Sequence, residues 1–249
     1  MRDTLVSQGW SVNESTDSSA IKSNIISDFA SMSSISSGSI LLFYYSGHGT
    51  VVGNSAVLIP YDGISATNIG QPNESATIVP SKLITPTDLF NLISTLPTKN
   101  VIVILDSCYS GGFVSSGSSI DASPPDYSLM PGYSAFSTAM SNFGSLLATN
   151  ASASGAKTPI VISAAGLAEF SWETNTLTIP PDTGHGVFTY YLLQSATNGD
   201  SDGDGFVTMT EAYAYTVSSM KSGWDSNPSN VAFLPHLSGG TRDLVLFTK

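Results

Sequence analysis

The chain has 249 residues, of which 11% are charged, and 8 Lys and Arg against 19 Asp and Glu give it a formal net charge of −11. This length accommodates one large α/β domain with a substantial core. Because the few basic residues are scattered, the composition argues against nucleic acid and anionic membranes as partners. No apolar stretch approaches the ~20 residues that span a bilayer, and the first residues show no secretory signal, so we expect no membrane span.

The first part of the chain predicts a strand, a helix and a second strand. Residues 10–15 resemble a short strand. Residues 16–32 place apolar side chains at the spacing of one helical face, after a Ser/Thr/Asp stretch suited to capping a helix. Residues 40–46 form an apolar run of strand length, and we expect a loop with His48 to follow it.

The next segment predicts a hairpin arm, a helix and a second buried strand. Residues 57–60 suit the hairpin arm. A helix is predicted over residues 85–96, because Thr-Pro-Thr-Asp at its start puts Pro in the first turn and an acid at the third position. The apolar run at residues 101–105 predicts a strand that leads to Cys108.

The segment after Cys108 is rich in small and polar residues. Residues 113–156 predict a long mobile loop with one helix near residues 133–147. Order is expected to resume with a buried strand at residues 160–165 and to end with a strand at residues 244–247. Strands that alternate with helices favour an α/β fold with a mostly parallel sheet.

Cys108 and His48 each follow a predicted buried strand. In a parallel sheet, reactive groups gather at the carboxyl ends of the strands, so two neighbouring strands would deliver both residues to one site. An imidazole near a thiol can take its proton and later return it to a leaving amine. A solitary cysteine is most often a buried small apolar residue. The position of Cys108 at a strand end, with a histidine at the next, is what points instead to a cysteine hydrolase.

Two motifs carry a resemblance to a known family. Tyr-Ser-Gly-His-Gly at residues 45–49 and Asp-Ser-Cys-Tyr-Ser-Gly at residues 106–111 resemble the His and Cys motifs of caspase-like (clan CD) cysteine peptidases, most of all those of metacaspases and their prokaryotic relatives. The resemblance implies a three-layer sandwich with a mostly parallel central sheet flanked by helices. It also implies one domain over residues 1–249, with a large-subunit-like part at 1–157 and a small-subunit-like part at 158–249.

The same resemblance implies residue roles. Cys108 is the nucleophile and His48 the general acid/base, while the backbone N–H groups of Gly49 and Cys108 form the oxyanion hole. Ser46 and Asp106 match positions that line the first specificity pocket in metacaspases. Because a buried carboxylate there would pair with a basic side chain, we expect cleavage after Arg or Lys. The alternative for Asp106 is a carboxylate that only caps a strand end with backbone N–H groups.

The start of the chain departs from the family pattern. In the family a central strand, which carries a second acid of the specificity pocket, precedes the first helix, whereas here Met1 stands where that helix begins. We therefore expect this first strand to be missing before Met1. Two further histidines have structural interpretations: His185 lies at the entrance of a predicted helix near the substrate cleft, and His236 is structural.

A twelve-residue acidic stretch, residues 200–211, matches the EF-hand loop. Helices are predicted on both sides, at residues 187–197 and 209–220. The alternative is an acidic surface turn, but four carboxylates this close repel one another without a cation. We expect Ca²⁺ as a structural clamp, and such a site favours an extracytoplasmic or secreted location. The predicted ligands are Asp200, Asp202, Asp204, Phe206 through its carbonyl, Thr208 and Glu211.

The sequence also suggests processing and two competing functions. Lys157 is the only basic residue between Cys108 and Lys221, so an enzyme that cuts after basic residues would cleave its own chain after Lys157. One competing hypothesis is a legumain-like peptidase that cuts after Asn or Asp. The other is a non-catalytic caspase-like module that binds Ca²⁺ and protein partners.

Overall fold

A computed structural model describes residues 1–52, 55–67, 75–109, 159–164, 171–179, 182–230, 232, 234–239 and 243–249. Its helices are α1 (Arg2–Ser7), α2 (Lys22–Ser31), α3 (Pro86–Ser94), α5 (Val187–Asn198) and α6 (Met209–Ser222), with 3-10 helices at Asp17–Ser19, Met32–Ser34, Tyr61–Gly63 and Pro80–Lys82. Its strands are β1 (Ile40–Val52), β2 (Ser55–Leu58), β3 (Ile64–Thr67), β4 (Ser75–Ile78), β5 (Asn100–Tyr109), β6 (Ile160–Ser163), β7 (Glu173–Ile179), β8 (Asp182–Gly186), β9 (Phe206–Thr208), β10 (His236–Gly239) and β11 (Val245–Thr248).

A five-stranded sheet with the order β10-β6-β5-β1-β2 forms the centre of the fold. Strand β5 pairs in parallel with β1 on one side and with β6 on the other, while β2 and β10 are antiparallel edges. The side chains of Ile102, Val103 and Ile104 in β5 are fully buried, as expected for a strand covered on both faces. The predicted α/β fold with a mostly parallel central sheet is confirmed.

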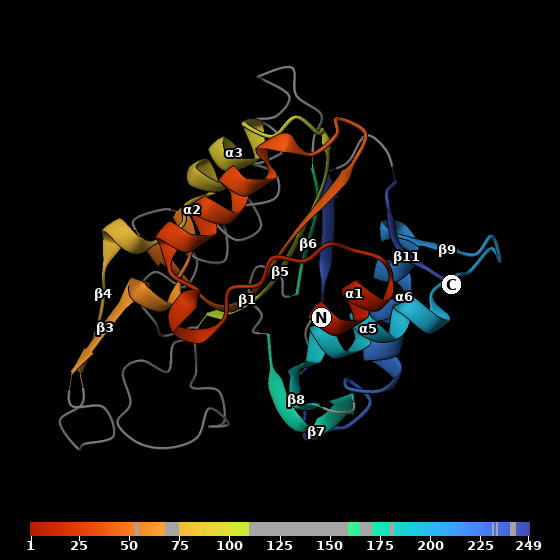
Figure 1. Ribbon diagram of the computed structural model, residues 1–249. Coiled ribbons are helices and arrows are strands. Elements are labelled where there is room, and N and C mark those ends of the chain that lie inside the picture. Colours follow the sequence, from red (N-terminus) through yellow and green to blue (C-terminus); the bar gives the residue numbers. More distant parts are fainter. Residues whose placement is uncertain are drawn as a thin grey trace.

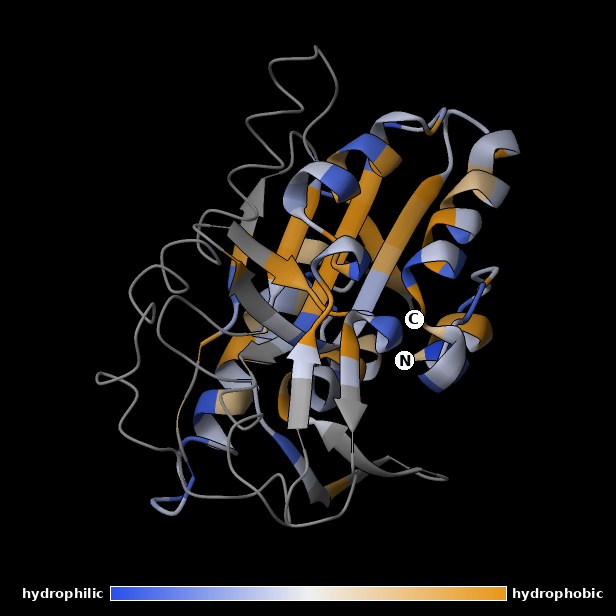
Figure 2. Ribbon diagram, turned by 90° about the vertical axis from the view of Figure 1, so that its left-hand side faces the viewer, coloured by the Kyte–Doolittle hydropathy of each residue, from blue (hydrophilic) through white to orange (hydrophobic). Residues whose placement is uncertain are grey.

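Helices cover both faces of this sheet and make three layers (Figure 1). Helices α2 and α3 pack on one face, over an apolar cluster that includes Phe29, Leu89 and Val103. Helices α1, α5 and α6 pack on the other, over a cluster that includes Ile104 and Phe188. Figure 2 shows the apolar runs of the central strands between these layers. The opposite faces of one strand thus bury two separate clusters, which is why the runs are continuous rather than alternating.

Two helix starts show how the layer on the α2 and α3 side is fixed. Helix α3 begins as predicted, because the Thr85 side chain accepts from the Asp88 N–H and the Asp88 carboxylate accepts from the Thr85 N–H. The start predicted for the preceding helix, at residue 16, was wrong, since α2 begins at Lys22. Its first N–H, that of Lys22, is capped by a residue far away in the sequence: it donates to Asp62 Oδ1 over 3.0 Å.

Three other details differ from the sequence-based expectations. The strand predicted at residues 10–15 was wrong, because this segment pairs with no strand in the described part of the chain and is instead anchored by the Trp10 indole, which donates to the Leu246 carbonyl over 3.1 Å. The loop expected around His48 was also wrong, since β1 continues through His48 to Val52 and turns back into β2 as an antiparallel pair. Strand β10 was not predicted.

The last part of the chain forms a smaller unit on the α5 face. Helices α5 and α6 flank residues 200–211 as predicted, and β9 pairs with the predicted C-terminal strand β11. The predicted loop at 113–156, with its helix at 133–147, lies outside the described residues. Within the described part of the chain, none of the helices has the length and apolar character needed to cross a bilayer.

Candidate active site

The parallel pairing of β1 and β5 sets His48 directly opposite Cys108. Hydrogen-bonded strands lie about 4.8 Å apart, so the two backbones are immediate neighbours at this point. The expectation that neighbouring parallel strands bring the His and Cys motifs together is confirmed, although both residues lie within the strands and not after them. The side chain of Cys108 is outside the described part of the structure.

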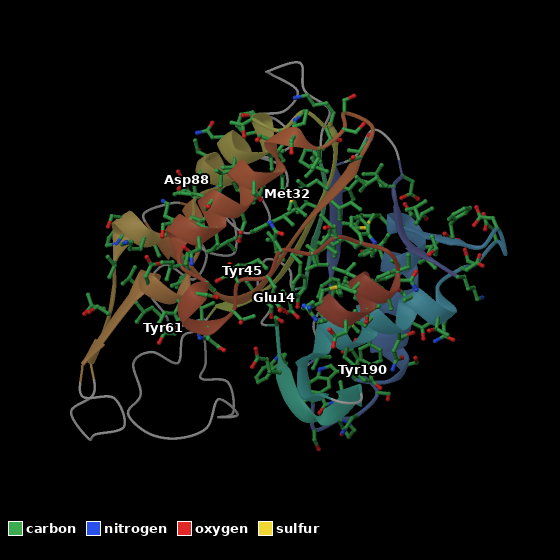
Figure 3. All side chains as sticks on the ribbon, viewed as in Figure 1. Glu14, Met32, Tyr45, Tyr61, Asp88 and Tyr190 are labelled. Carbon is green, nitrogen blue, oxygen red and sulfur yellow. The ribbon has the colours of Figure 1, made fainter. Side chains whose placement is uncertain are left out.

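The backbone at His48 is held by Tyr45 and by the return strand. Its carbonyl accepts from the Ile59 N–H over 2.9 Å and from the Tyr45 hydroxyl over 2.8 Å. Gly47 lies over the same ring (Tyr45 is labelled in Figure 3): with φ at +158°, an added Cβ there would stand 3.0 Å from Tyr45 Oη. A side chain at position 47 would therefore force the Tyr45 ring to shift and would disturb its bond to the His48 carbonyl.

The His48 side chain keeps access to solvent while protein atoms surround part of the ring. This partial burial lowers the pKa of His48 below its ordinary value of 6.5. The shift favours neutral imidazole at pH 7, which is the form that accepts a proton.

Ser46 and Gly49, the other predicted residues of β1, flank His48. Gly49 is buried and lies opposite Tyr109, one residue beyond the His48 and Cys108 pair. Ser46 is exposed, lies opposite Asp106 in the strand register, and its side chain hydrogen-bonds to Tyr44. All predicted residues of these two strands therefore fall within one short stretch of the ladder.

Asp106, opposite Ser46 in this stretch, is closed off from solvent, with 4% of its surface exposed. The Ser171 hydroxyl donates to Asp106 Oδ1, and the Thr189 hydroxyl donates to Asp106 Oδ2 over 2.5 Å. The backbone N–H of Thr189 is a further donor. Gly186, the residue before α5, touches the carboxylate so closely that any side chain there would overlap Asp106 Oδ2.

The electrostatic setting of Asp106 is unusual for an acid. Burial raises its pKa above the ordinary value of 3.8, the Ser171 and Thr189 hydroxyls oppose that rise, and the negative charge of Glu173 adds to it. None of the ion pairs among the described residues includes Asp106. The carboxylate is hydrogen-bonded, yet no described cation neutralises it.

Sequence reasoning missed the residues that hold Asp106. Thr189 gave one indication, because it is a polar residue among the fully buried apolar residues Val187, Phe188 and Leu192 of α5. Ser171 gave none. The predicted helix entrance after His185 is confirmed, since α5 begins at Val187; the His185 side chain lies outside the described atoms, and His236 opens β10.

The acidic loop at residues 200–211 brings three predicted ligands together. The carboxylate oxygens of Asp200, Asp202 and Asp204 lie within 4.8 Å of one another. Gly203 and Gly205 have φ values of +78° and +88°, which only glycine adopts readily. The Gly203 N–H donates to Asp200 Oδ1 over 2.8 Å. Clustered carboxylate oxygens are the donors that Ca²⁺ prefers.

Glu211 at the end of this loop is bound by N–H and hydroxyl donors. Its carboxylate accepts from the backbone N–H and the hydroxyl of Thr208 and from the same two groups of Ser201. The Thr208 N–H is the largest contribution, and together these donors lower the pKa of Glu211 to about 2. Phe206 is exposed and its N–H donates to Asp204 Oδ1. Lys157, the predicted processing site, lies outside the described residues.

One comparison with known proteins agrees with the observed fold. The model of the caspase domain family (Peptidase C14) matches residues 1–232, a span that includes the His motif, the Cys motif and the acidic loop. A search of curated proteins gives no match. The chain belongs to the caspase domain family of cysteine peptidases.

Proposed function

We propose that this cysteine peptidase cleaves peptide bonds after Arg or Lys, with Cys108 as nucleophile, His48 as acid/base and Asp106 as the acid that selects the basic side chain. The observation that carries the proposal is Asp106 itself, a buried carboxylate beside the paired His and Cys positions with no described cation against it. An unneutralised buried charge is costly, so a cationic substrate group has more to gain there than an uncharged one.

The register of β1 and β5 supports the chemical assignment. In the proposed reaction His48 takes the thiol proton of Cys108, and the sulfur attacks the carbonyl carbon of the scissile bond. The N–H groups of Gly49 and Cys108 would stabilise the oxyanion, a contribution of ~3 kcal/mol for each donor. His48 then gives its proton to the leaving amine. Water, deprotonated by His48, hydrolyses the thioester and restores the free enzyme.

The selectivity is tested with fluorogenic peptides that differ only in the residue before the cut: Arg, Lys, Asn, Asp or Leu. We expect kcat/KM to be highest for Arg and Lys, and Cys108→Ala to abolish turnover of every peptide. Preference for Asn or Asp would instead support the legumain-like function. Absence of turnover, together with absence of covalent labelling by a peptidyl electrophile, would support the non-catalytic module.

Ca²⁺ is the second part of the proposal. We infer that Asp200, Asp202 and Asp204 bind it with Glu211, because their oxygens converge and the loop glycines permit the tight turn. The remaining predicted ligands are the Phe206 carbonyl and Thr208. Strand β9 within the loop pairs with β11, so bound Ca²⁺ would clamp the end of the chain onto α5 and α6. A calcium-stabilised fold suits the extracytoplasmic location proposed from the sequence.

The metal is tested by thermal unfolding in Ca²⁺, Mg²⁺ and EDTA. A ligand present at a hundred times its Kd adds ~2.7 kcal/mol to the free energy of unfolding, so we expect a clear rise in Tm with Ca²⁺ alone. The variant Asp202→Asn/Asp204→Asn should lose this rise. Asp28→Asn is the matched control, because Asp28 accepts from Ser15 on a separate surface and should leave the calcium effect intact.

Self-cleavage after Lys157 follows from the same selectivity and would separate the large-subunit-like part from the small-subunit-like part. Mass spectrometry of the purified wild type should show fragments that end at Lys157 and begin at Thr158. Cys108→Ala and Lys157→Gln should both stay intact. A cut that persists in Cys108→Ala would show that another protease makes it.

A further inference from the structure

A chain of three hydrogen-bonded side chains runs behind the site into α5. The Tyr44 hydroxyl lies 2.8 Å from Thr189 Oγ1, and Thr189 Oγ1 lies 2.5 Å from Asp106 Oδ2. The residues come from β1, α5 and β5, and Thr189 and Asp106 are both almost fully buried, with 5% and 4% of their surfaces exposed. Hydrogen bonds thus connect three separate parts of the sequence, from Tyr44 through Thr189 to one carboxylate oxygen of Asp106.

The direction of these bonds follows from counting protons. An ionised carboxylate can only accept, so the single hydroxyl proton of Thr189 goes to Asp106. Thr189 Oγ1 must then accept from Tyr44, which makes Tyr44 the donor of the outer bond. A hydroxyl that already accepts a hydrogen bond is a stronger donor, so Tyr44 strengthens the bond from Thr189 to Asp106.

Helix α5 is also held by contacts outside this chain of hydrogen bonds. Its first N–H, that of Val187, donates to the Trp172 carbonyl, and Val187, Phe188 and Leu192 are fully buried in the core. Buried hydroxyls elsewhere in the helical layer bond within their own helix: Ser195 donates to the Leu192 carbonyl and Thr216 to the Ala212 carbonyl. Thr189 is different, because its hydroxyl donates to another element.

We propose that Thr189, oriented by Tyr44, is a positioning residue for substrate selection, which fixes the Asp106 carboxylate as an acceptor for the basic side chain of the substrate. This inference rests on the proposed role of Asp106. Ser171 holds the other carboxylate oxygen, so the two hydroxyls set the plane of the group from both sides. A bidentate or charge-assisted bond to the substrate depends on that plane.

The hydroxyl also governs the charge of Asp106. Burial and the Glu173 charge raise the pKa of Asp106, while the Ser171 and Thr189 hydroxyls lower it. Loss of the Thr189 donor removes part of the opposing effect, so the neutral form persists to higher pH. The charged or titratable groups that act on Asp106 in the described part are Glu173 from β7 and Tyr44 from β1, and the backbone N–H of Thr189 in α5 also donates to it.

The test compares Thr189→Val, Thr189→Ser and Tyr44→Phe with wild type, on paired peptides with Arg or Leu before the cut. For Thr189→Val we expect KM for the Arg peptide to rise about tenfold, the expected effect of losing one bond to a charged group, with kcat changed less than about twofold. The acid limb of kcat/KM for the Arg peptide should move to higher pH, and the Leu peptide should show neither change. Thr189→Ser should restore both values.

Thr216→Val is the matched control, because it removes an equally buried Thr hydroxyl that bonds only within α6. Equal losses on both peptides in Thr189→Val, without rescue by Ser, would overturn the inference and leave Thr189 a merely structural residue. If Thr189→Val does not fold, Tyr44→Phe provides the test. An unchanged KM and an unchanged acid limb for the Arg peptide in Tyr44→Phe would contradict the inference. A wild type without preference for Arg refutes the proposed function itself, which is a separate outcome.

Discussion

The two acidic regions of this chain place their carboxylates in opposite environments. Asp106 is buried towards the carboxyl end of β5, the middle strand of the central sheet, and burial raises its pKa. Glu211, at the end of the acidic loop, is surrounded by N–H and hydroxyl donors that lower its pKa to about 2. One region holds a charge that the fold disfavours, and the other holds a charge that the fold stabilises.

Under the proposed function, the difference separates a substrate-binding acid from acids that support the fold. A buried charge without a cation lowers stability, and the proposed function accounts for it by the substrate cation that it would bind. The loop carboxylates accept hydrogen bonds from their own turn and from the start of α6, so they contribute to the fold even before a metal is considered. Neutralising Asp106 should therefore change the selectivity of the enzyme without lowering its stability. Neutralising the acids of the loop should lower the stability without changing the selectivity.

Asp106→Asn gives the largest expected effect. Loss of one partner of a buried charge pair commonly costs 2–5 kcal/mol, so kcat/KM for the Arg peptide should fall by roughly a hundredfold or more, with little change for the Leu peptide. Because the pKa of Asp106 is raised in the folded state, the wild type loses stability relative to this variant as pH rises above 3.8. Thermal unfolding at pH 4 and pH 7 should show the gap in Tm widening in favour of Asn. A Tm of Asp106→Asn markedly below that of wild type at pH 7 would contradict the contrast between the two acidic regions.

Gly186→Ala tests the same region by shape alone. The added Cβ would overlap Asp106 Oδ2, so the carboxylate or the start of α5 must move. Overpacking of this kind typically costs 1–3 kcal/mol, and we expect kcat/KM for the Arg peptide to fall about tenfold or more. Gly203→Ala, which strains a positive φ in the exposed loop, is the control that should lower stability without changing selectivity. Equal kinetics in the two variants would contradict this account.

The pH dependence of KM sharpens the comparison further. In the proposed function a basic side chain binds the ionised form of Asp106, so KM for the Arg peptide should fall as pH rises through the raised pKa of this group. The lowered pKa of His48 keeps more of its imidazole neutral below pH 6.5 than the ordinary value would. The Leu peptide should show no such fall in KM. A KM for the Arg peptide that does not change with pH would mean that Asp106 does not face the substrate.

Thr208→Val gives the smallest expected effect. It removes the side chain that accepts from the Glu211 N–H at the start of α6, and loss of such a cap costs ~1 kcal/mol, or about 2–4 °C in Tm for a chain of this size. In wild type measured in EDTA, the stabilisation from Glu211 is present above pH 4.5 and is lost as pH falls towards 2. Selectivity should be unchanged. A change in the ratio of kcat/KM for the Arg and Leu peptides would show that the two regions are coupled.

Local patterns predicted the elements whose determinants lie close in sequence. The apolar runs at residues 40–46 and 101–105 became β1 and β5, and the Thr85 cap opened α3 as expected. The pairing of Asp106 with Ser171 and Thr189 could not be predicted, because these residues stand 65 and 83 residues away from it. Strand β10 was missed for a similar reason, since His-Leu-Ser-Gly has no apolar run and forms a strand only by pairing with β6.

Covalent labelling of the wild type tests the central claim most directly, namely that His48 and Cys108 on neighbouring strands act together beside an acid that selects basic side chains. The probe is a peptidyl-Arg acyloxymethyl ketone, and tandem mass spectrometry locates the adduct. We expect labelling at Cys108, strong slowing in His48→Ala, and loss of the advantage of the Arg probe over a Leu probe in Asp106→Asn. An unlabelled Cys108, or labelling that is equally fast without His48 and equally fast with both probes, would contradict the account.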